Sequence, residues 1–149
     1  MKRSWAALGL VLALSVLMPK ESAAQTQDIG DRKVGKGMSL GQNYPNPFNP
    51  ETSFPFGVGD SPTCSDAAKQ HRVSLKVYNL LSQLVAIPVV RGGNNAGQPL
   101  DNLLLPCGEF VAYWDGKVIG TGREAASGVY LYRLEVDGKT LLRTAISVK

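Results

Sequence analysis

Apolar and polar residues alternate along several short stretches of the chain, with the period of two that is typical of half-buried β-strands. In residues 73–78, Val73, Leu75 and Val77 fall on one face. The same kind of pattern predicts strands at five further stretches, which are residues 52–58, 84–90, 109–114, 129–136 and 140–148. No stretch after the N-terminal segment carries a helical stripe. Six short strands joined by turns predict an all-β fold, a β-sandwich.

Turn residues divide these stretches. Asp137-Gly138 separates the last two and is a strong signal for a two-residue hairpin, because such turns need positive φ. Residues 79–82 turn the chain between stretches 73–78 and 84–90, which predicts a second hairpin. Pro55 lies inside stretch 52–58 and lacks an N–H group, so that strand is expected at the edge of a sheet.

The core is expected to form around large residues of these stretches. Trp114 can fill the centre of a sandwich, provided that its indole N–H finds one partner. Tyr130 and Tyr132 share a face of stretch 129–136, as Leu75 and Val77 do in theirs. We therefore expect core and turn residues here and no ligand contacts.

Two long connections, residues 59–72 and 91–107, carry the two cysteines of the chain. The hairpin of stretches 73–78 and 84–90 brings the ends of both connections to one end of the sheet. Cys64 and Cys107 are therefore expected to form a disulfide. The run from Leu103 through Leu104 to Leu105 leaves two interpretations open, a lid folded over the core or an exposed patch for a partner.

The N-terminal segment resembles an export signal. Lys2 and Arg3 precede the apolar run 5–18, and small residues follow up to Ala24. We expect residues 1–24 to be a signal peptide cleaved after Ala24, or an uncleaved hydrophobic anchor helix that contacts the membrane through residues 5–18. Residues 25–39 are polar and are expected to be a flexible linker, followed by the domain at 40–149. The protein is then periplasmic or associated with the cell envelope, and its cysteines meet an oxidising compartment.

Charge and catalytic motifs exclude several function classes. The formal charge is +4, and removal of residues 1–24 takes away three basic residues and one acidic residue, which leaves +2. This balance favours neither a nucleic-acid partner nor an anionic membrane surface. The chain has one histidine, His71, which is expected to be a solvated loop residue, and it has no G-x-S-x-G motif. We expect no catalytic site, metal or cofactor, and no enzyme activity.

The segment from Leu40 to Pro50, LGQNYPNPFNP, is expected to be a stiff, extended entry to the domain. The alternative interpretation is a calcium loop built from the asparagine carbonyls, but the segment lacks the carboxylates that calcium recruits. Tyr44 and Phe48 are the expected anchors, and Tyr44, Asn46 and Phe48 are candidates for partner contacts together with the three leucines 103–105.

This segment closely resembles the opening of the C-terminal domains that direct cargo through the type IX secretion system, and the related immunoglobulin-like domain of the flagellar hook-capping protein. The resemblance continues through VSLKVYNLLSQLV from Val73, YWDG from Tyr113 and ASGVYLYRL from Ala126. It implies an immunoglobulin-like (fibronectin-like) β-sandwich without enzymatic activity. The chain departs from the pattern at Gln83, where the family usually has glycine, and in its two cysteine-bearing connections.

In the secretion family such a domain is the tail of a much larger cargo, whereas here a short leader and linker precede it. We therefore expect a non-catalytic structural or assembly subunit in the periplasm, which docks through its sandwich on a larger membrane-associated protein complex. The alternative is a secretion-sorting module or a surface-attached protein.

Overall fold

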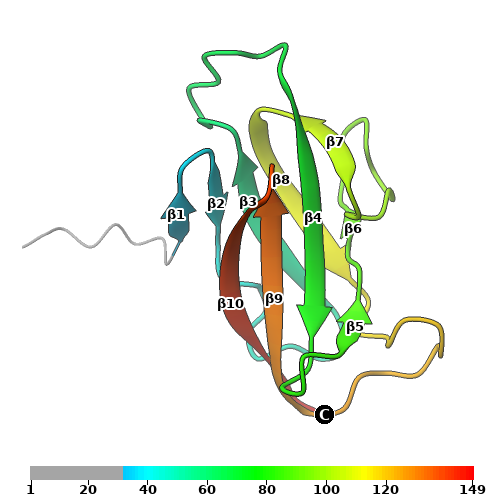
Figure 1. Cartoon of the computed structure of the whole chain (residues 1–149). Coiled ribbons are helices and arrows are strands. Elements are labelled where there is room, and N and C mark those ends of the chain that lie inside the picture. The colour runs from blue at the N-terminus through cyan, green and yellow to red at the C-terminus, as the bar shows by residue number, and fades with distance from the viewer. Residues whose placement is uncertain (1–31) are drawn as a thin grey trace, which may run out of the picture.

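The alternating stretches form strands throughout the computed structural model, which describes residues 32–149 (Figure 1). The strands are β1 (Lys33–Gly35), β2 (Met38–Leu40), β3 (Thr52–Val58), β4 (Gln70–Tyr78), β5 (Leu84–Ala86), β6 (Val89–Val90), β7 (Leu103–Pro106), β8 (Gly108–Trp114), β9 (Gly128–Val136) and β10 (Lys139–Ser147). No helix occurs among the described residues, so the all-β prediction is confirmed. The expected signal or anchor helix at 1–24 lies outside them, and within 32–149 no helix could cross a membrane.

The strands build two antiparallel sheets that lie face to face (Figure 1). One sheet has the order β1-β2-β3-β8-β6, and the other has the order β10-β9-β4-β5, with β7 paired to β4. Alternate residues of each strand meet between the sheets. Tyr132, Leu75 and Val77 are fully buried there, and Trp114 and Tyr130 are at most 7% exposed. The buried polar tips are satisfied, since Trp114 Nε1 donates to Lys117 O at 2.8 Å and Tyr132 Oη donates to Gly41 O at 2.9 Å.

The expected linker is ordered over much of its length. Lys33–Gly35 and Met38–Leu40 form a hairpin in which Lys33 stands opposite Leu40. The turn passes through Gly37 at φ 77°, a conformation that glycine adopts without steric cost. Met38 and Leu40 are buried, so tertiary packing holds this short hairpin in place. The linker prediction is therefore wrong for residues 33–39, and the domain begins earlier than residue 40.

The edge prediction for strand 52–58 is also wrong, because β3 lies between β2 and β8. Gly41 N donates to Pro55 O at 2.8 Å, as in an ordinary ladder. The return bond from residue 55 is missing, since proline has no N–H. Gly41 O accepts instead from the buried hydroxyl of Tyr132. A distant tyrosine thus supplies the donor that proline lacks, which lets Pro55 occupy a central strand.

The predicted strand 84–90 is divided between the two sheets. Leu84–Ala86 pairs with β4 in one sheet, whereas Val89–Val90 pairs with β8 in the other. Pro88 lies at the crossing and cannot donate to a ladder, so the strand stops there. The outer edge of β6 is covered, because Val90 N donates to Gln98 O at 2.9 Å. The predicted hairpin therefore survives only for β4 and β5.

Candidate interaction surfaces

The Asn/Pro segment, residues 41–50, covers the free edge of β10. Phe48 N donates to Ile146 O at 2.8 Å, and Val148 N donates to Phe48 O at 3.0 Å. Asn46 Oδ1 accepts from Ile146 N at 3.0 Å. An uncovered edge strand would present these groups to other chains. The candidate partner contact Asn46 therefore serves the internal pairing of this domain.

Phe48 is a core residue and is not accessible to a partner. Its side chain is 1% exposed, and its ring centroid lies 5.4 Å from that of Trp114 and 6.4 Å from that of Tyr130. The prediction of a partner contact at Phe48 is wrong, because the β10 pairing turns the side chain inward. Tyr44 differs: its backbone pairs with Ser53, while its side chain stays 51% exposed.

The leucine run forms a strand, β7, which pairs with the first half of β4. The alternation of a strand then separates the three side chains. Leu105 is fully buried, Leu103 packs partly buried against the core, and Leu104 is 52% exposed. The run is therefore neither a lid folded over the core nor one continuous exposed apolar patch. Only Leu104 of the three is left as an exposed candidate for partner contact.

The two cysteines form the expected disulfide, with Cα atoms 5.5 Å apart, at the end of the sandwich that lies uppermost in Figure 1. We call this end the cysteine end. Gly59 lies close to the bridge. A Cβ added at Gly59 would lie 2.9 Å from Cys107 Sγ and 3.3 Å from His71 Nε2. Only glycine fits there, because its φ is also 72°.

His71 contradicts its sequence-based prediction. It belongs to β4, is 7% exposed, and its Nδ1 lies 2.7 Å from Asp137 Oδ2. The other carboxylate oxygen of Asp137 accepts from Arg72 N at 2.9 Å. Partial burial raises the pKa of Asp137, but the hydrogen bonds from Arg72 and His71 outweigh it and hold that pKa below its usual value. β4 begins earlier than the pattern indicated, which is why His71 is buried.

Asp137→Asn is expected to lower the free energy of unfolding at neutral pH by about 1 kcal/mol, because the carboxylate loses one charge-assisted hydrogen bond and 43% of its side chain is exposed to screening water. Asparagine also tolerates the positive φ of this turn position. A lowered native pKa stabilises the fold above the unfolded pKa and ceases to do so as pH falls through the native one. The difference in urea unfolding between the two proteins should therefore shrink below pH ~4. Asp66→Asn is the control and should change nothing; an equal loss at all pH values would contradict the assignment.

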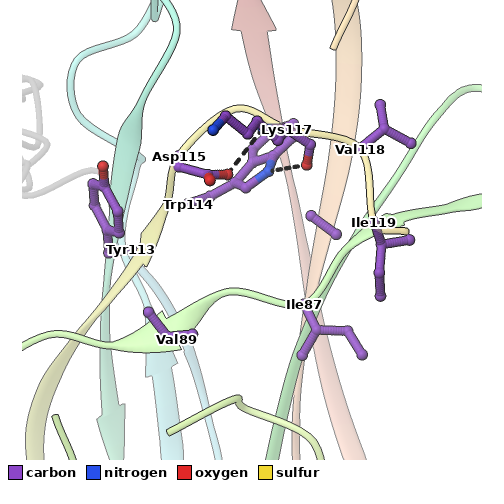
Figure 2. Close-up of a pocket in the computed structure, with 9 residues that line it drawn as sticks. Ile87, Val89, Tyr113, Trp114, Asp115, Lys117, Val118 and Ile119 are labelled. Atoms are coloured by element: carbon purple, nitrogen blue, oxygen red, sulfur yellow. Dashed lines mark hydrogen bonds between the residues drawn. The ribbon is translucent and has the colours of Figure 1, made fainter. Parts of the chain in front are cut away.

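An apolar groove opens at the other end of the sandwich, where the chain crosses between the sheets. Its volume is about 320 Å³, and Figure 2 shows Trp114 on one wall with Ile87 and Val89 across from it. Val118 and Ile119 close the side. Two hydrogen bonds hold this wall in place. Trp114 Nε1 donates to Lys117 O, and Lys117 N donates to Asp115 Oδ1. The full lining is Ala86, Ile87, Val89, Tyr113, Trp114, Asp115, Lys117, Val118 and Ile119.

Further exposed aliphatic side chains belong to the β4–β5 turn and to the groove lining, at the same end of the sandwich (Figure 1). Leu80 and Leu81 form the turn between β4 and β5 and are 66% and 79% exposed, and Leu84 follows at 39%. Ile119, 48% exposed, is held beside β5 because its N–H donates to Val85 O at 2.7 Å. We call Leu80, Leu81, Leu84 and Ile119, together with the groove, the apolar end. The sequence signal for it was a pair of leucines in a turn whose other residues are polar.

The described residues hold no cluster of three or more His, Cys, Asp or Glu side chains that could bind a metal ion. Comparison with family models, with curated proteins and with solved structures finds no match to this chain. The candidate surfaces therefore stand on their geometry: an apolar end, and a charged cysteine end around His71.

Proposed function

We propose that this protein is a non-catalytic structural subunit, with a sandwich of the immunoglobulin-like (fibronectin-like) type, that docks in the periplasm on a larger membrane-associated protein complex. The observation that carries the proposal is the apolar end. Its two most exposed leucines, Leu80 and Leu81, lie in the β4–β5 turn, and the groove begins at the last residue of β5, Ala86. Adjacent exposed apolar residues of this kind are typical of protein–protein contact sites.

The strand edges favour docking through this end over the addition of a partner strand. The Asn/Pro segment covers β10, residues 97–100 cover β6, and Ile119 N donates to Val85 O on β5. A partner strand needs unpaired backbone groups, and these three edges offer few. The other outer strands, β1 and β7, have only 3 and 4 residues. Side-chain burial in the groove is then the available source of affinity.

The periplasmic location is part of the same proposal. Lys2, Arg3 and the apolar run 5–18 have the order of an export signal, and the disulfide of Cys64 and Cys107 suits an oxidising compartment. An uncleaved leader would act as a tether and raise the effective concentration at the membrane. No cofactor or nucleic acid enters the proposed function.

The experiment is a mild-detergent pull-down from native membranes with the double variant Leu81→Asp/Ile119→Asp. We expect recovery of the partner complex to fall at least about tenfold, since each buried aliphatic side chain contributes roughly 1.5–3 kcal/mol to docking. Leu104→Asp is the matched comparison, because it changes the other exposed candidate contact, at the opposite end, and docking through the apolar end predicts that recovery stays unchanged. Equal recovery in all three proteins would reject the proposed surface. The secretion-sorting alternative would instead be supported by two results together: recovery of every protein without a partner, and transport of a fused reporter across the outer membrane.

A further inference from the structure

A second cavity, of about 420 Å³, lies at the cysteine end. Four segments of the chain meet around it: the β1–β2 turn, the β3–β4 connection, the start of β4 and the β9–β10 turn. Its lining contrasts with that of the apolar groove, because charged side chains dominate it. Lys36, Lys69 and Lys139 come from three of these segments, and His71 comes from the fourth.

His71 presents an unused nitrogen at this cavity. The residue is more than nine-tenths buried, and its Nδ1 is held by Asp137 at 2.7 Å. Among residues 32–149, Nε2 has no hydrogen-bond partner, and it lies beside Gly59, which also lines the cavity. A side chain at Gly59 would fill the space in front of Nε2, where its Cβ would stand 3.3 Å away. Nε2 therefore faces the cavity as a ring nitrogen that water or a ligand can reach.

Three lysines and three carboxylates line the cavity, and two of the carboxylates already accept hydrogen bonds from neighbouring residues. Both oxygens of Asp137 are occupied by His71 and Arg72, and Asp60 accepts hydrogen bonds from the backbone N–H and the hydroxyl of Ser65. Asp66 is the remaining carboxylate of the lining. Within residues 32–149, none of the three lysines forms an ion pair with a carboxylate. Their ammonium groups are therefore available to an acceptor from outside.

We propose that this cavity is a binding site for a small oxyanion, a phosphate or a carboxylate, with Lys36, Lys69, Lys139 and the Nε2 of His71 as its donors. An ammonium or imidazolium group forms short, strong hydrogen bonds to such oxygens. In the imidazolium form both ring nitrogens are donors, so Nδ1 donates to Asp137 and Nε2 can donate to the anion. This site stands independently of docking through the apolar end, from which it is separated by the length of the sandwich (Figure 1).

The test uses the fact that the chain has a single histidine, which gives one unambiguous imidazole signal. The full chain in mild detergent is titrated with inorganic phosphate, with acetate and with chloride at constant ionic strength, while the His71 Cε1–H resonance is followed by NMR. We expect a saturable shift with phosphate or acetate and none with chloride, and the anion that saturates identifies the source. Lys69→Gln/Lys139→Gln should weaken the binding about tenfold, since two charge-assisted hydrogen bonds are lost.

Lys117→Gln is the matched control, because it removes a lysine at the apolar end and should leave the titration unchanged. Urea unfolding of each variant verifies that the fold is intact. A shift that does not saturate, that chloride reproduces, or that keeps its full affinity in the double lysine variant would overturn the proposal.

Discussion

Phe48→Ala is expected to lower the free energy of unfolding by about 3–5 kcal/mol, the usual cost of removing a large aromatic side chain from a core. Phe48 is 1% exposed and packs against Trp114 and Tyr130, so the substitution leaves a cavity between the two sheets. It also loosens the segment that covers β10, since Phe48 forms both backbone hydrogen bonds there. Urea unfolding followed by tryptophan fluorescence measures the effect.

Tyr44→Ala is the matched control. It removes an aromatic ring four positions earlier in the same segment, but that ring is 51% exposed, so unfolding should change by less than about 0.5 kcal/mol. If the Asn/Pro segment were mainly a docking peptide, the two variants would have similar stability and both would lose partner binding. That result would contradict the edge-covering role described above.

The double variant Cys64→Ser/Cys107→Ser should lose about 4 kcal/mol of stability, since the bridge closes a long loop in the unfolded chain. The two residues are 43 positions apart, and the bridge joins the β3–β4 connection to the start of β8. Reduction of the unmodified protein by a dithiol should have a similar effect. The loss is expected to fall mainly on the cysteine end, because the apolar end makes no contact with the bridge.

Urea unfolding at equal pH, with and without the dithiol, measures this loss. The dithiol should not destabilise the double serine variant further, which makes that variant its own control. Stability equal to that of the parent would mean that the β3–β4 connection is held by other contacts, such as the hydrogen bonds between Asp60 and Ser65.

Local sequence patterns were sufficient to predict a strand where the alternation of its own apolar and polar residues determines its pairing. The stretch 129–136 and the Asp137-Gly138 turn predict β9 and its hairpin with β10, which the structure contains. The patterns gave wrong predictions where the position of a strand depends on a residue that is distant in the sequence. Pro55 belongs to a central strand only because Tyr132, far along the chain, bonds Gly41 O, and no local rule reports that bond. The hairpin of β1 and β2 likewise depends on the burial of Met38 and Leu40.

The candidate sites also divide into those that local sequence patterns predict and those that depend on distant residues. The disulfide was predicted from a hairpin that the structure contains only in part, and the pairing of β7 with the start of β4 is what brings Cys107 to the β3–β4 connection. The groove could not be predicted, since Ile87 and Trp114 come together only when the chain crosses from one sheet to the other. His71 was misplaced because the polar residues Gln70, His71 and Arg72 resemble a loop, although they pair with β7. Its burial is a consequence of that pairing.

Docking through the apolar end can be observed by site-specific photo-crosslinking in native membranes. A photoreactive residue is placed at position 81, and in a matched protein at position 104, where the native leucines are both exposed. We expect a crosslink from position 81 to one defined membrane-complex protein, with no crosslink to that protein from position 104. Crosslinking of the same protein from both positions, or from position 104 alone, would contradict it.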